Sequence, residues 1–193
     1  MFATTKNLAT ILLAAAAAIT VSAAPTATSG GAQKLPSRTT GDEPAVTHTV
    51  AAGRGGLLEF QPFNIEAEPG EVIEFHFGPR SHSVVQSSFE EPCVQLAGGF
   101  NSGFNFAVEE GQAENVYQFT VKDDKPIWFF CGQAAHCSTG MVGSVNQVVD
   151  SGNTIDAFIV KARTFQGNAT LLDESAGDVD GKVLPNPDPL AGF

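Results

Sequence analysis

At 193 residues the chain has room for one domain, or one domain with tails, and its 42% hydrophobic residues are enough to build a core. Its 10 Lys and Arg against 21 Asp and Glu give a net charge of −11, which repels nucleic acid and anionic lipid, so neither is an expected partner. Glycine and proline number 20 and 11, and long helix-forming stretches are few. This composition favours a β-rich fold with many turns.

The beginning of the chain has the features of an export signal. Lys6 supplies a positive charge, residues 8–21 form an apolar run that is short for a membrane span, and the small residues Ser22 and Ala23 follow. We predict a signal peptide over residues 1–23. The expected product is secreted, to the extracellular space or the cell wall, and has no membrane span.

Polar segments flank the predicted domain on both sides. Residues 24–44 are rich in Thr, Ser, Gly and Pro, which predicts a flexible leader, and residues 164–193 are acidic and rich in Pro, which predicts a disordered tail. The one N-glycosylation sequon begins at Asn168, which is the predicted glycosylation site. The folded domain is therefore predicted over residues 45–163, a length that burial can stabilise.

Hydrophobicity inside the domain alternates with a period of two. In residues 72–77 one face is apolar and the other is mixed. The glycine-rich residues 93–111 predict a long loop. Further strands are predicted at residues 47–52, 57–63, 115–121, 126–131, 141–147 and 155–160, with turn formers between them. Short strands without a convincing long helix predict an all-β sandwich or barrel.

Three cysteines are an odd number for an exported chain. Two are expected to pair, which leaves one that is reactive or bound to something. Four residues separate Cys131 from His136, and four more separate His136 from Met141. A thiolate, an imidazole and a thioether suit copper, and a trigonal His₂Cys set with a weak axial Met defines a type 1 (blue) copper site. One loop is thus predicted to supply three metal ligands.

The second imidazole has to come from another segment. His82 follows a Gly78-Pro79 turn and leads into a predicted strand, so it is displayed at a loop-to-strand corner. By contrast, His48 is interpreted as an exposed residue at a strand end, and His76 as a surface imidazole beside a carboxylate. The predicted metal ligands are His82, Cys131, His136 and Met141.

These residues stand in a pattern that resembles a known family. The pattern runs from His82-Ser83-Val84-Val85 through Cys93 to Trp128-Phe129-Phe130-Cys131, His136-Cys137 and Met141. It resembles the cupredoxins, and most closely the plant phytocyanins and the fungal extracellular cupredoxin-like proteins. The resemblance covers residues 45–160. It implies a Greek-key β-sandwich or barrel of about seven to eight strands and one type 1 copper ion on the four predicted ligands.

The resemblance also implies how the cysteines are used. Carried over from the phytocyanins, Cys93 and Cys137 form a disulfide and Cys131 is free. The rival pairing of Cys131 with Cys137 would destroy the metal site. The chain departs from many blue-copper proteins at Ser83, where these have an Asn that links the two ligand segments, and a Ser makes that link less certain.

A type 1 site leaves no open coordination position for a substrate, so one-electron transfer is expected and enzyme activity is not. The redox partner is unknown, and a monomer is expected. The alternative is an extracellular copper-binding or buffering protein, or a wall-associated one, without a dedicated redox role. A multicopper oxidase would need His-x-His pairs, which the four histidines do not form, and structural zinc does not suit a Met ligand.

Overall fold

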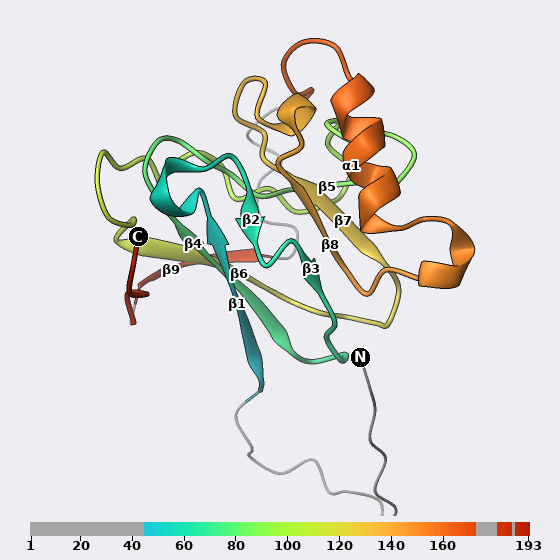
Figure 1. Cartoon of the computed structure of the whole chain (residues 1–193). Coiled ribbons are helices and arrows are strands. Elements are labelled where there is room, and N and C mark those ends of the chain that lie inside the picture. Colours follow the sequence, from blue (N-terminus) through green and yellow to red (C-terminus); the bar gives the residue numbers. More distant parts are fainter. Residues whose placement is uncertain (1–44, 173–180, 187) are drawn as a thin grey trace, which may run out of the picture. The chain divides into compact units, whose positions relative to one another are not determined.

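The structure is a computed structural model that describes residues 45–172, 181–186 and 188–193 (Figure 1). The predicted signal peptide and leader, residues 1–23 and 24–44, lie outside the described residues. The elements in chain order are β1 (Thr47–Ala52), β2 (Phe60–Gln61), β3 (Asn64–Ile65), β4 (Val72–Phe77), β5 (Val85–Ser87), β6 (Asn115–Thr120), β7 (Ile127–Phe130), β8 (Val142–Val145), α1 (Ile155–Thr164) and β9 (Gly181–Pro185), with three short 3-10 turns at Arg54–Gly56, Cys137–Thr139 and Val149–Ser151.

Two mixed sheets make up the domain. The larger has the order β2-β1-β4-β6-β9 and the smaller the order β3-β8-β7-β5. β1 pairs with β4 and β3 with β8 in parallel, and the other pairs are antiparallel. The prediction of an all-β sandwich is confirmed.

The main core joins the two sheets. The apolar face of β4 contributes Phe75, which is fully buried and meets Phe129 of the other sheet edge-on at 5.4 Å between ring centroids. Phe60 of β2 approaches the same Phe129 ring at 5.1 Å. Cys131 and Met141 belong to this core, so the predicted ligand loop begins and ends among packed aromatic and aliphatic side chains.

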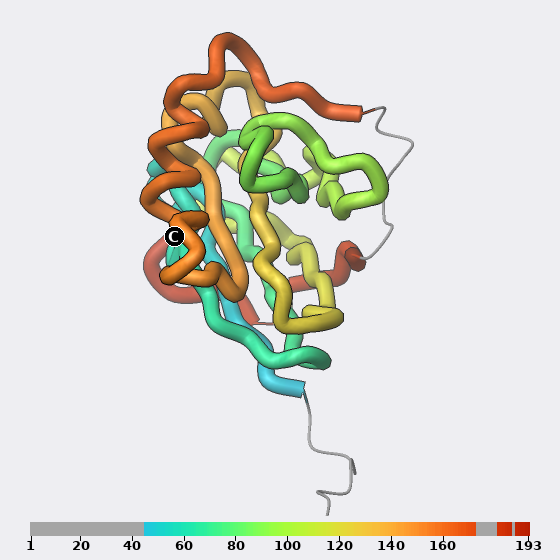
Figure 2. The backbone as a smooth tube through the Cα atoms, turned by 90° about the vertical axis from the view of Figure 1, so that its right-hand side faces the viewer, coloured from blue at the N-terminus to red at the C-terminus, as the bar shows by residue number. Residues whose placement is uncertain are grey.

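Helix α1 corrects the predicted strand at residues 155–160. Its buried residues are Ile155, Phe158 and Ala162, a helical spacing, and the Thr154 side chain caps the first turn by accepting a hydrogen bond from the N–H of Ala157. The buried face packs on the outside of the smaller sheet, where Phe158 meets Trp128 at 4.8 Å between ring centroids. Figure 2 shows the helix, in orange, alongside the strand that leads into it.

The predicted disordered tail, residues 164–193, is also corrected where the structure describes it. Thr164 ends α1, Thr170 forms a bridge with Val94, and β9 pairs with β6 along its length. Most β9 side chains are exposed, so backbone hydrogen bonds hold the strand rather than burial, and a reading based on hydrophobicity misses it. Residues 173–180 and 187 of the tail lie outside the described residues.

The other predicted strands are present, two of them (β1 and β4) with the predicted bounds and the rest shorter. The strands predicted at 47–52, 72–77, 115–121, 126–131 and 141–147 are β1, β4, β6, β7 and β8, while the strand predicted at 57–63 shrinks to β2. Residues 93–111 contain bridges and turns but no named element. Within the described part of the chain, no helix has the length and apolar character to cross a membrane.

Candidate metal centre

Three of the four predicted ligands converge on one point. The Nδ1 of His82 lies 3.8 Å from the Sγ of Cys131, and the Nδ1 of His136 lies 3.5 Å from the same sulfur. The three ligand atoms all lie within 4.8 Å of one another. Among the residues that the structure describes, no other group of three or more His, Cys, Asp or Glu side chains meets this criterion.

The predicted ligands lie in two segments between strands, one from β4 to β5 and one from β7 to β8. Cys131 directly follows β7 and is buried, and His136 precedes the 3-10 turn at Cys137–Thr139. Gly140 ends that turn at a φ of 107°, in the left-handed region that favours glycine, and the chain then enters β8. His82 lies between β4 and β5 and is fully buried, whereas His136 is half-buried.

Met141 is locked to the same loop through its backbone. Its N–H donates to the carbonyl of His136, and its carbonyl accepts from the N–H of Cys131, both at 3.0 Å. The Met141 side chain is fully buried in the main core. The structure thus holds Met141 beside the cluster, while its bond to a metal belongs to the proposal below.

The ring of His82 sits in a seat made of backbone atoms. Its Nε2 lies 3.1 Å from the carbonyl oxygen of Pro79, which can only accept, so Nε2 carries the proton and Nδ1 turns its lone pair toward Cys131. Gly53 forms the other wall, because a Cβ atom there would lie 2.1 Å from Nε2. Sequence reasoning missed Gly53: the Gly-rich stretch signals a turn, but nothing in it points to His82.

Ser83 links the two segments that carry the predicted ligands, as the Asn at this position does in many blue-copper proteins. Its hydroxyl oxygen accepts a 2.9 Å hydrogen bond from the N–H of Gly132, and both residues are buried. This bond ties the His82 segment to the loop that begins at Cys131.

The same loop is tied down a second time by a disulfide. Cys93 and Cys137 are bonded across 44 residues, with their Cα atoms 5.6 Å apart, and Cys131 is free and buried. This is the pairing that the cupredoxin resemblance implied. Since Cys137 directly follows His136, the disulfide restrains the position of that predicted ligand.

Burial keeps the site uncharged when no metal is bound. It lowers the pKa of His82 to about 4, lowers the pKa of His136, and raises the pKa of the Cys131 thiol to about 11. In each case the charged form is the one that loses its hydration. At pH 7 the cluster therefore presents two neutral imidazoles and a thiol.

The donor set fits a copper ion. A nitrogen and a sulfur about 2.0 and 2.3 Å from a common ion, at the angle of a trigonal plane, are about 3.7 Å apart. The separations of 3.8 and 3.5 Å in the structure match that spacing. A cysteine thiolate with two imidazoles is a donor set that suits copper.

The other two histidines do not join the cluster. His48, at the start of β1, is half-buried and lies 2.7 Å from a carboxylate oxygen of Glu71. The prediction of a surface position for His76 is wrong: its ring is buried, 2.7 Å from Glu74 and 3.0 Å from the side-chain oxygen of Gln112. Both faces of β4 are covered, because every residue from Ile73 to Phe77 is buried.

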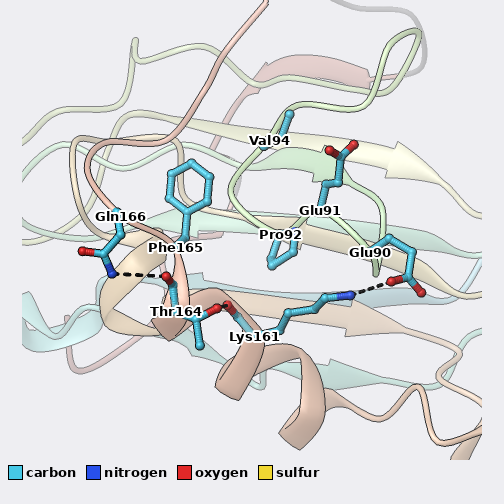
Figure 3. Close-up of a pocket in the computed structure, with 8 residues that line it drawn as sticks. All are labelled: Glu90, Glu91, Pro92, Val94, Lys161, Thr164, Phe165 and Gln166. Atoms are coloured by element: carbon cyan, nitrogen blue, oxygen red, sulfur yellow. Dashed lines mark hydrogen bonds and ion pairs between the residues drawn. The ribbon is translucent and has the colours of Figure 1, made fainter.

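A surface hollow of about 370 Å³ lies elsewhere, between α1 and the segment before Cys93 (Figure 3). An ion pair of 2.6 Å between Lys161 and Glu90 spans it. None of the predicted metal ligands lines it; the lining residues are Glu90, Glu91, Pro92, Val94, Lys161, Thr164, Phe165 and Gln166.

Sequence comparison finds relatives among fungal and bacterial proteins. The chain is 34% identical over 113 residues to an "Extracellular serine-rich protein" and 32% identical over 114 residues to a "Probable GPI-anchored cupredoxin-1", both of Arthroderma benhamiae. It is 31% identical over 110 residues to a pseudoazurin of Paracoccus pantotrophus. These matches cover 58%, 59% and 57% of this chain, and 43%, 58% and 66% of the relatives, so the chain spans about half the length of the proteins it matches. No family model matches.

Solved structures similar to this one include two cupredoxins. The pseudoazurin of Hyphomicrobium denitrificans matches 60% of this chain and 98% of its own at 19% identity, with a TM-score of 0.38. A purple cupredoxin of Nitrosopumilus maritimus matches 50% of this chain and 95% of its own at 14% identity, with a TM-score of 0.38. The sequence relatives, the two-sheet sandwich and the converging His, Cys and His side chains lead to one assignment: the chain belongs to the cupredoxin superfamily.

Proposed function

We propose that this protein binds one type 1 copper ion through His82, Cys131, His136 and Met141 and serves as a secreted carrier of single electrons. The observation that carries the proposal is the buried convergence of two imidazole Nδ1 atoms on the Cys131 sulfur, at 3.8 and 3.5 Å. In this assignment the Cys131 thiolate would be the strongest donor to the ion, the two imidazoles would be the next, and the Met141 thioether would be the weakest.

Copper bound at such a site supplies a one-electron couple between Cu(II) and Cu(I). What the chain supplies is a fixed and dry set of donors. The Ser83–Gly132 hydrogen bond, the disulfide at Cys137 and the backbone bonds of Met141 hold the ligand segments in place. Ligands that are already held in position have little to rearrange when the charge of the site changes.

The ligand exposure supports a carrier rather than an enzyme. His82, Cys131 and Met141 are fully buried, and His136 alone among the four is half-buried. All four donors come from the protein, whereas a catalytic metal keeps a position for substrate. A redox partner would therefore dock over His136, through the small transient interface typical of such encounters.

The same proposal includes export. The expected signal peptide, a disulfide of the kind that persists in oxidising compartments, and relatives named as extracellular or GPI-anchored support a place outside the cell or in its wall. We propose a monomer that is glycosylated at Asn168, which is exposed, and that has no nucleic-acid partner and no membrane span.

Voltammetry of the copper-loaded protein separates electron transfer from copper buffering. The carrier role predicts a reversible one-electron wave and rapid reduction and reoxidation without loss of metal. A buffering protein would release copper, or change its ligands slowly, on reduction. Copper loss within a few redox cycles would overturn the carrier role while leaving copper binding intact.

A further inference from the structure

The C-terminal residues of the chain contact the corner that holds His82. Arg54 donates from Nε to the carbonyl of Gly192 at 2.8 Å and from Nη2 to the carbonyl of Ala191 at 2.6 Å. The guanidinium carbon also lies 6.0 Å from the centroid of the Phe193 ring. We call these three C-terminal residues, together with Arg54, the C-terminal clamp.

Gly53 and Pro79 lie against the His82 ring, and the C-terminal clamp involves the residue next to each of them in the chain. Arg54 directly follows Gly53, which faces the His82 ring. The Phe193 ring lies against the backbone of Gly78, where an added Cβ would come within 2.9 Å of it. Gly78 directly precedes Pro79, the residue whose carbonyl accepts from Nε2 of His82. The N–H of Gly78 donates to the carbonyl of Ala52 at 2.8 Å, so the two walls are also joined to each other.

The segment that carries the clamp is attached at several of its described residues. β9 pairs with β6, and the side chain of Asn186 donates to the side-chain oxygen of Gln112 at 2.9 Å. The side chain of Gln112 in turn donates to the carbonyl of Leu190 at 2.8 Å. The clamp is thus the end of a tethered segment, and its position is fixed relative to the larger sheet.

We infer that the C-terminal clamp positions the His82 ring, and that Arg54 and Phe193 are positioning residues for the metal centre although neither is a ligand. The inference rests on the proposed function for its effect on metal binding. Its physical basis is that the Nε2 side of the His82 ring, the side turned away from Cys131, lies against backbone atoms at Gly53 and Pro79. Loosening the two turns that carry these residues frees the ring and lets its Nδ1 leave the position facing Cys131.

Arg54→Ala tests the inference, with Lys161→Ala as the matched control. Lys161 is also a cation with a polar partner and a nearby ring, beside a hollow that none of the predicted metal ligands lines. It pairs with Glu90 at 2.6 Å (Figure 3) and lies 5.1 Å from the centroid of the Phe89 ring. Exposed contacts of this sort contribute little to stability, so both variants of the full chain should fold. Phe193→Ala removes the other half of the clamp.

The first readout needs no metal. In nitrogen-15 NMR spectra of the metal-free protein, solvent exchange of the His82 Nε2 proton should be about tenfold faster in Arg54→Ala and Phe193→Ala than in wild type and Lys161→Ala. In the double variant that combines Arg54→Ala with Phe193→Ala, the His82 Nε2 proton should exchange no faster than in either single variant. Each substitution alone already disables the same clamp. Arg54→Lys keeps a cation near the Phe193 ring but loses the forked geometry of the guanidinium. Its exchange rate should lie between those of wild type and Arg54→Ala.

The second readout is copper affinity, which should fall about tenfold in Arg54→Ala, at the lower end of losses seen when residues behind metal ligands are removed. If the exchange rate of the His82 Nε2 proton stays within twofold of wild type in both Arg54→Ala and Phe193→Ala, the inference is overturned, regardless of the copper affinity. An equal rise in Lys161→Ala would overturn it too, because the effect would then be general loosening. Failure of the wild type to bind copper would refute the proposed function and leave the exchange result to decide the clamp.

Discussion

The hydroxyl of Ser83 accepts a 2.9 Å hydrogen bond from the backbone N–H of Gly132, and this bond links the residue after His82 to the residue after Cys131. Both groups are buried. A buried polar group that has no hydrogen-bond partner destabilises the folded state by the full free energy of its lost hydration.

Ser83→Ala should therefore lower the free energy of unfolding of the metal-free protein by about 1–3 kcal/mol, because the Gly132 N–H loses its acceptor. Urea denaturation followed by fluorescence measures the change. Ser88→Ala is the matched control: its hydroxyl also accepts from a backbone N–H, that of Glu91, but in an exposed position. Equal destabilisation by both substitutions would contradict the role assigned to Ser83.

Gly53 offers a second test, with a control in the same turn. Gly53 and Gly55 both have positive φ angles, +81° and +62°, but a Cβ on Gly53 would lie 2.1 Å from His82 Nε2, while one on Gly55 would meet nothing within 4 Å. Both Ala variants should lose about 1 kcal/mol of stability from the backbone alone. In Gly53→Ala alone, the His82 ring must also move, and copper binding should be lost or at least tenfold weaker.

Copper titrations followed by absorption measure the copper affinity of Gly53→Ala and Gly55→Ala. Retention of wild-type copper affinity by Gly53→Ala would show that the His82 ring is not bound as the structure places it. Loss of copper by Gly55→Ala would show that strain in the turn, rather than contact with the ring, is responsible.

Proton release on metal binding follows from the pKa values of the site. At pH 7 the Cys131 thiol, with a pKa of about 11, is protonated, whereas His82, with a pKa of about 4, and His136, with a lowered pKa, are already neutral. Copper binds the thiolate, so we expect about one proton released per copper ion and an affinity that rises about tenfold per pH unit from pH 7 to 10. Calorimetry in buffers of different ionisation enthalpy counts the protons. Release of two or more would mean that an imidazole is protonated beforehand.

Met141→Gln tests the axial position. The substitution should leave copper bound and the thiolate colour largely intact, because the trigonal donors remain. It should also lower the reduction potential, because a harder amide oxygen favours Cu(II). Voltammetry of both proteins measures the difference. An unchanged potential would remove Met141 from the ligand set.

Much of the site was readable from the sequence because its determinants are local. Cys131, His136 and Met141 occur at regular spacing in one loop, and the period-two pattern predicted the strands that frame it. The partner of Cys93, by contrast, came from the family resemblance alone. Pairing across 44 residues is a property of the fold that spacing does not encode.

The misses have different physical causes. The strand predicted at 155–160 is part of a helix, because the spacing of Ile155, Phe158 and Ala162 and the cap at Thr154 outweigh the short apolar run. β9 was missed because its backbone pairing leaves little trace in side-chain hydrophobicity. The seat of His82 on Gly53 is a contact between distant segments, which no local pattern reveals.

The most direct test of the central claim is the visible absorption spectrum of the protein loaded with one equivalent of Cu(II), compared with that of Cys131→Ser. A trigonal His₂Cys site predicts an intense thiolate-to-copper charge-transfer band in wild type and one copper ion per chain. It also predicts that the band vanishes in Cys131→Ser, since a hydroxyl cannot replace the thiolate. A wild-type protein that binds copper without this band, or a Cys131→Ser variant that keeps it, would contradict the assignment of His82, Cys131 and His136 as the metal site.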